Sequence, residues 1–222
     1  MSSLKPLVSV AAFVMLASLP LAAQQGAAPP PNTEFTITKI ETAFQTSPGT
    51  SGSGYDKRVR DAGQWLEVEV TFNWQPRVQE PKYIDDLTIS YFVLLKNPSK
   101  ESPAGTLLAG KVEHINVAQG KDLKSVMYVS PRSLQRLFDG KIPVNVKQTV
   151  AGAGAEILLG GAVVAGFATD GRGADKARPW AWWDAEMFKE KKSGLLLNKL
   201  ETPFAPLAWD YHEEIKSTPA AR

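Results

Sequence analysis

The sequence predicts an all-β protein, an antiparallel β-sandwich of about seven strands with one short helix and an extended C-terminal tail. Two observations predict this class. Apolar and polar residues alternate with period two in several segments, and stretches rich in glycine, proline and serine separate those segments. The pattern occupies residues 34–170, which we expect to form one sandwich domain, and a different composition occupies residues 171–222.

The chain begins with features typical of an export signal. Lys5 precedes an apolar stretch from Leu7 to Leu19, and small residues offer a cleavage site after Ala23. We therefore expect a signal peptide over residues 1–23, followed by a proline-rich spacer over residues 24–33. The chain has no cysteine, which excludes a lipoprotein anchor. The expected location is the periplasm, the outer membrane or the cell surface.

Two segments show the strand pattern most clearly. The first runs from Trp65 to Gln75, and its apolar members should all point into the core: Leu66, Val68, Val70, Phe72 and Trp74. In the second, from Leu87 to Leu95, the apolar residues Phe92 and Leu94 lie on the opposite face. The end of this strand should therefore be covered on both sides.

The segment from Phe35 to Phe44 changes phase in its middle, so we expect a β-bulge near Lys39. It comes first after the spacer and is a candidate edge strand, guarded by the lysine and the bulge.

Further strands are expected at Thr106–Val117, Leu123–Val129, Ile142–Val150 and Ile157–Phe167, with "AGAGA" as a gap between the last two. Between the second and third of them, Ser130 and Pro131 are suited to begin a short helix and Gly140 to end it. Seven strands with a helix in one crossover indicate an immunoglobulin-like sandwich, although a jelly roll or another sandwich topology stays open.

The C-terminal segment is apolar and aromatic but lacks periodicity, and Pro203 and Pro206 exclude a long helix or a central strand. We expect Leu195 to Tyr211 to dock on the sandwich, with Phe204 and Trp209 as anchors. At least one tryptophan of the preceding "ARPWAWWD" stretch should touch these anchors.

No catalytic or metal-binding pattern is recognisable, so the sequence predicts neither an enzyme nor a cofactor. The two histidines, His114 and His212, lack metal-ligand spacing and are interpreted as ordinary, partly exposed residues. A Gly-rich loop with Asp170 and Asp175 is at most a weak calcium site. A formal net charge of +2 without a basic block does not indicate nucleic-acid binding.

The candidate binding residues are Trp180, Trp182 and Trp183. Aromatic rings can stack on sugars, but a platform needs its rings on one exposed face, and neighbouring residues of a strand point to opposite faces. Burial against the sandwich and the tail is the favoured interpretation, with sugar or partner binding as the alternative.

The motifs "LLLNKLETPFAPLAWDYHEE", "ARPWAWWD" and "TFNWQP" resemble a family of exported, pilus-like immunoglobulin-fold proteins of Verrucomicrobia, of the Akkermansia type. The resemblance implies a non-enzymatic structural or adhesive role at the outer membrane and supplies no catalytic residues. Protein partners at the envelope, bound by strand addition at an edge, are the expected ligands. A module that binds mucin or another polysaccharide is the alternative.

Overall fold

The computed structural model describes residues 34–48, 63–77, 82–97, 104–169, 178–188, 190–207 and 210–217. The expected signal peptide, the spacer, the Asp170–Asp175 loop and the anchor Trp209 lie outside these residues. Within them, no helix is both long and apolar enough to cross a membrane.

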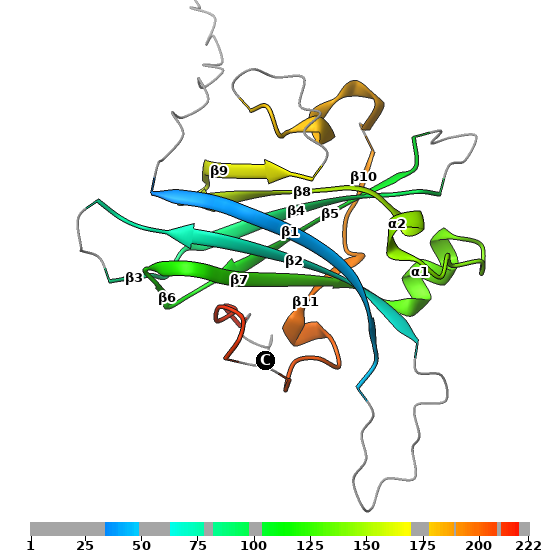
Figure 1. Ribbon diagram of the computed structural model, residues 1–222, viewed down its shortest axis with the longest axis horizontal. Coiled ribbons are helices and arrows are strands. Elements are labelled where there is room, and N and C mark those ends of the chain that lie inside the picture. The colour runs from blue at the N-terminus through cyan, green and yellow to red at the C-terminus, as the bar shows by residue number, and fades with distance from the viewer. Residues whose placement is uncertain are drawn as a thin grey trace, which may run out of the picture.

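Two main sheets pack face to face around one core, which confirms the predicted all-β sandwich (Figure 1). The four-stranded sheet has the order β1-β2-β7-β11 and the five-stranded sheet the order β10-β5-β4-β8-β9. A small third sheet joins β3 and β6. The strands are β1 (Phe35–Thr46), β2 (Gln64–Trp74), β3 (Tyr83–Ile84), β4 (Leu87–Leu95), β5 (Thr106–His114), β6 (Val117–Ala118), β7 (Gly120–Val129), β8 (Val150–Leu159), β9 (Ala162–Ala168), β10 (Lys191–Lys192) and β11 (Leu196–Asn198).

Helical segments are short and lie between the strands or in the C-terminal segment. The predicted helix is α1 (Pro131–Leu137), and the Ser130 hydroxyl accepts a hydrogen bond from the Ser133 amide at its start. The others are α2 (Val146–Thr149), η1 (Trp182–Asp184), η2 (Glu186–Phe188) and η3 (Lys199–Glu201).

The alternation along β2 and β4 places side chains as predicted. The five β2 residues predicted to point into the core, Leu66 to Trp74 in steps of two, are each at most 2% exposed. On β4, the outward ring of Phe92 stacks on Trp183 with a centroid distance of 4.2 Å, so this strand is covered on both faces.

β1 lies at the edge of its sheet, and within the described residues β2 is the strand with which it pairs. The expected bulge is present, because the register shifts between Ile37 and Lys39 and leaves Thr38 without a partner residue. The Thr38 hydroxyl donates to the carbonyl of Thr71 across the bulge.

Three predictions between Ile142 and Phe167 were wrong. The expected strand Ile142–Val150 is a loop followed by α2, because the Asn145 side chain accepts from the Lys147 amide and begins a helical turn. The supposed gap "AGAGA" lies inside the buried strand β8. The expected strand Ile157–Phe167 is the hairpin of β8 and β9, which turns at Gly160 and Gly161 with φ of 56° and 82°.

The two sides of the sandwich differ in how their edges are covered. On one side the C-terminal segment adds β10 beside β5 and β11 beside β7. Farther along, His114 forms an antiparallel bridge with Ile215, and the Glu213 amide donates to the Lys124 carbonyl. On the other side lie β1 and β9, the outermost strands of their sheets (Figure 1).

Candidate functional site

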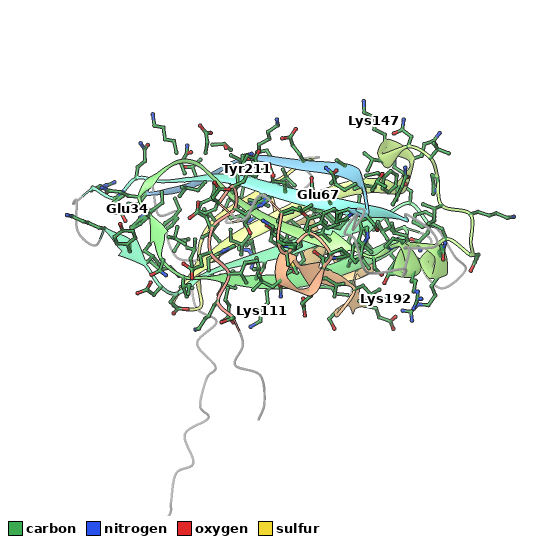
Figure 2. All side chains as sticks on the ribbon, turned by 90° about the horizontal axis from the view of Figure 1, so that it is seen from below. Glu34, Glu67, Lys111, Lys147, Lys192 and Tyr211 are labelled. Atoms are coloured by element: carbon green, nitrogen blue, oxygen red, sulfur yellow. The ribbon has the colours of Figure 1, made fainter. Side chains whose placement is uncertain are left out.

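A groove of about 630 Å³ lies on the outer face of the four-stranded sheet, between β1 and the C-terminal segment. Its floor is formed by the outward residues of β1, β2 and β7, and its wall by Phe204, Leu207, Tyr211 and His212. Two of the residues that line the groove, Glu67 and Tyr211, are labelled in Figure 2. The sequence pattern identified Glu67 and Glu69 as polar outward residues of β2, but not that the tail covers them.

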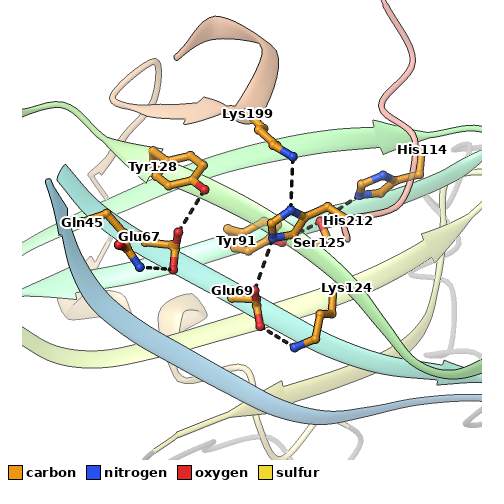
Figure 3. A network of polar contacts seen from close by, with 10 residues as sticks. All are labelled: Gln45, Glu67, Glu69, Tyr91, His114, Lys124, Ser125, Tyr128, Lys199 and His212. Atoms are coloured by element: carbon orange, nitrogen blue, oxygen red, sulfur yellow. Dashed lines mark hydrogen bonds and ion pairs between the residues drawn. The ribbon is translucent and has the colours of Figure 1, made fainter. Parts of the chain in front are cut away.

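Glu69 is the centre of an ionic cluster beneath the tail (Figure 3). One carboxylate oxygen accepts from Lys124 Nζ at 2.6 Å and the other from His212 Nε2 at 3.2 Å. Burial raises the pKa of the Glu69 carboxyl, but the hydrogen bonds from His212 and Lys124 outweigh it and hold the pKa below its ordinary value.

Lys199 extends this cluster from the start of η3. Its Nζ lies 3.4 Å from His212 Nδ1, so Lys199 donates to a histidine whose other nitrogen donates to Glu69. Lys199 is only 4% exposed, and desolvation lowers its pKa. The cluster fixes the tail to the outer face of the sheet.

Glu67 has partners of a different kind. Its carboxylate accepts from the Tyr128 hydroxyl at 3.0 Å and from the Gln45 amide at 3.1 Å, and both donors are neutral (Figure 3). On the same face, Phe204 stacks on Tyr128 and meets Trp65 edge to face. Phe204 is therefore an anchor of the tail, as predicted.

A buried polar chain crosses the core behind this face. Tyr91 donates to Ser125 Oγ at 2.7 Å, Ser125 Oγ lies 2.8 Å from His114 Nε2, and His114 Nδ1 lies 3.2 Å from the Glu214 carbonyl. Burial lowers the pKa of His114 to about 4, so the ring is neutral at pH 7. The expectation of two partly exposed histidines was wrong for His114, which is 1% exposed, whereas His212 is partly buried, with 8% of its side chain exposed.

The Ser125–His114 pair has the distance of a nucleophile and its base, but Ser125, His114 and Tyr91 are each at most 1% exposed. A reacting group has no access to a serine at that depth. The chain of hydrogen bonds instead satisfies polar groups within the core and connects it to the C-terminal segment.

The candidate binding residues Trp182 and Trp183 lie on the outer face of the other sheet. They are 5% and 0% exposed and pack with Leu107, Phe92 and Phe188. β8 provides the space, because a Cβ on Gly154 would lie 1.9 Å from the Trp183 ring. We expected at least one of the three tryptophans to touch a tail anchor. Phe204 does not show this contact, because it belongs to a separate cluster on the opposite face of the sandwich.

Trp180 is half-buried over β9, where a Cβ on Gly166 would lie 1.9 Å from its indole nitrogen. Its Nε1 donates to Glu156 at 3.2 Å, and the same carboxylate pairs with Arg178 at 3.0 Å. Burial raises the pKa of Glu156, although Arg178 and Trp180 act against it. The three tryptophans therefore do not form a flat exposed row, and two of the three rings are closed to a sugar.

Among the described residues, no group of three or more histidine, cysteine, aspartate or glutamate side chains could hold a metal ion. The groove and the unpaired edge of β1 are the two features considered for binding below. The sequence indicated the edge because Phe35–Phe44 comes first after the spacer, whereas the groove arises from the long-range docking of an aperiodic tail.

The fold places the chain among β-sandwich proteins whose own C-terminal segment covers the sheets. Comparison with known proteins gives the family. A family model matches residues 26–219, and the chain belongs to this family, the pilus-like family of the Akkermansia type. A crystal structure of a protein from Akkermansia muciniphila has a TM-score of 0.65 and 22% sequence identity. The match covers 83% of this chain and 94% of that one. No curated protein sequence matches the chain.

Proposed function

We propose that this protein is a non-enzymatic structural component exported to the cell envelope, where it assembles with protein partners by accepting a strand at β1. Membership of a pilus-like family supports an envelope role. The export signal expected in residues 1–23 agrees with that location.

The observation that carries the proposal is the unequal protection of the sheet edges. The C-terminal segment covers the edges of β5 and β7 with strands and backbone hydrogen bonds. β1, a strand of 12 residues, has β2 as its sheet neighbour and no second one among the described residues. A long, unpaired edge is a template for another strand, and natural sheets usually protect such edges.

The backbone groups that would bind the partner follow from the register. The Ser47 amide donates to the Gly63 carbonyl, one position beyond the pair Thr46–Gln64. Bonding residues alternate in an antiparallel ladder, so the backbone groups of Thr42, Phe44 and Thr46 face away from β2. These three residues form the accepting edge.

Lys39, Glu41 and the bulge restrict where a strand can add. Lys39 and Glu41 form an exposed ion pair at 2.8 Å beside the bulge. Charge and irregularity both disfavour unspecific edge pairing. The half of β1 from Thr42 to Thr46 lies beyond these guards and is regular in register with β2.

The test is a pull-down from the native cell envelope. Residues 24–222 serve as bait, once with the wild-type sequence and once with Thr42→Pro. Proline removes one amide donor at the open edge, and the pairing with β2 is retained because that amide faces away from it. We expect wild type to retain specific partners and Thr42→Pro to lose them, with a thermal midpoint within a few degrees of wild type. Equal capture by both proteins would refute strand addition at this edge.

Ala43→Pro is the matched control, because the Ala43 amide faces β2 and its loss should weaken the sheet as well as capture. A glycan array with the same proteins examines the carbohydrate alternative. Binding of mucin-type glycans by wild type and Thr42→Pro alike, without envelope partners, would favour that alternative.

A further inference from the structure

We propose that the strand accepted by β1 carries an arginine or lysine whose side chain enters the neighbouring groove and pairs with Glu67 and Glu41. This inference rests on the proposed function, because it requires a strand at the β1 edge. It adds the chemistry by which that strand is recognised.

The groove is placed to receive a side chain from an added strand. Its floor includes three outward residues of β1: Ala43 and Gln45 in the accepting half, and Glu41 directly before it. Side chains of a new neighbour to β1 would alternate between the core and this outer face. Ala43 is the smallest of the three, and directly across from it on β2 lies Glu67. A long side chain passing over Ala43 is therefore directed toward that carboxylate.

Of the three carboxylates on the groove floor, Glu67 has no cationic partner in the described part of the chain, whereas Glu41 pairs with Lys39 at 2.8 Å. Glu41 lies directly opposite Glu69, with Glu67 two residues away on the same face of β2. Like charges in directly opposite positions destabilise a sheet. Lys124 and His212 bind Glu69, whereas the hydrogen bonds of Glu67 in the described part of the chain come from neutral donors. A cation brought by the partner would pair with Glu67 and lower the repulsion among the three neighbouring carboxylates.

The groove wall suits the remainder of such a side chain. Phe204, Leu207 and Tyr211 offer apolar surface, and Tyr211 is 52% exposed. Arginine and lysine lay their aliphatic stems along apolar surface and place their charges over aromatic rings. The protein already contains this arrangement once: Lys124 Nζ pairs with Glu69 and lies 4.9 Å from the centre of the Tyr211 ring.

The absence of native cysteine allows a direct test by disulfide tethering. A variant of residues 24–222 with the single substitution Thr46→Cys is equilibrated with three extended peptides, each of which carries a thiol. They differ only in one residue: arginine, glutamine or glutamate. Mass spectrometry then measures which peptide is captured. We expect the arginine peptide to be captured roughly three- to fivefold more than the glutamine peptide, the ratio of a modest ion pair.

Glu67→Gln combined with Glu41→Gln should abolish this preference, since the amides keep the shape and remove both charges. Tyr83→Cys is the matched control site, because Tyr83 is 59% exposed and lies beside Asp85 and Asp86 but away from the groove. Equal capture of the three peptides at Thr46→Cys, or the same arginine preference at Tyr83→Cys, would overturn the inference. Thermal unfolding of each variant confirms that the fold is intact.

The two proposals fail in distinguishable ways. Loss of envelope partners in Thr42→Pro without an arginine preference at Thr46→Cys would retain strand addition and reject the basic side chain. An arginine preference that the Glu67→Gln and Glu41→Gln changes remove would support the groove chemistry, even where envelope capture does not depend on β1.

Discussion

At the scale of single residues, two glycines of β8 and β9 leave space for tryptophan rings because they have no side chain. Gly154 lies under Trp183 and Gly166 under Trp180, at contacts that leave no space for a Cβ. From the sequence, Gly154 was interpreted as part of a gap and Gly166 as part of a strand, because the packing of each depends on a tryptophan distant in the chain. Their function becomes visible only when the C-terminal segment is in place.

Gly154→Ala should destabilise the protein by roughly 1–3 kcal/mol, because the new methyl group would push Trp183 off Phe92. Chemical denaturation measures the change. The double variant Gly154→Ala/Trp183→Phe should cost less than the sum of the two single changes, since a smaller ring leaves room for the methyl group. Strict additivity would contradict this packing of Gly154 against Trp183.

The buried His114 predicts how stability depends on pH. Its pKa is about 4 in the folded chain, against about 6.5 when unfolded. Between these values the unfolded chain binds a proton that the folded chain does not, so stability falls as pH drops from 6.5 to 4. The expected loss is about 3 kcal/mol.

Denaturation at pH 7 and pH 4 tests this, with His114→Gln as the comparison. The variant should be less stable at pH 7 and should lose clearly less stability than wild type as the solution is acidified. The same pH dependence in both proteins would show that His114 is not the group responsible.

At the scale of elements, the sequence predicted strands best where one face is buried and the other polar. The β2 and β4 patterns gave both the strand and the direction of its side chains. β8 was missed because alanine and glycine have low hydrophobicity and small volume, although packing buries them on both faces. α2 was missed because the cap at Asn145 outweighs the alternation of Ile142, Val144 and Val146.

The β8–β9 hairpin gives a prediction of its own. Both turn residues, Gly160 and Gly161, have positive φ, which is the geometry of a type I′ turn and favours Asn-Gly. Gly160→Asn should therefore leave stability within about 0.5 kcal/mol of wild type, whereas Gly161→Val should cost more than about 1 kcal/mol. Thermal unfolding of the two variants measures this, and the reverse order would contradict the assigned turn.

At the scale of the whole molecule, the sandwich is completed by its C-terminal segment. The sequence indicated that an aperiodic apolar tail has to dock, and it named Phe204. It did not indicate that the tail adds strands to both sheets or that the tryptophans and Phe204 cover opposite faces. Those features depend on contacts between residues such as His212 and Glu69, 143 positions apart, which no local pattern encodes.

Truncation after Gly194 should therefore be severely destabilising. It removes β11, the Phe204 anchor and the bonds of His212 and Glu214. Each large apolar side chain lost from the interface costs about 1.5–3 kcal/mol, within a total stability of about 5–15 kcal/mol for a typical domain. Thermal unfolding beside residues 24–222 is the measurement. An unchanged midpoint and unchanged solubility would show that the tail is dispensable.

The central claim is that the molecule has one closed side and one open side and assembles through the open one. Site-specific photo-crosslinking in cells that produce the protein tests it most directly. The probe replaces Thr46 or Thr36 on β1, or, for comparison, Lys111 on β5, which are all exposed positions. We predict discrete protein adducts when the probe is at Thr36 or Thr46 and none when it is at Lys111. Adding Thr42→Pro should abolish the adducts from the Thr46 position. Adducts from Lys111 with none from β1 would contradict the account.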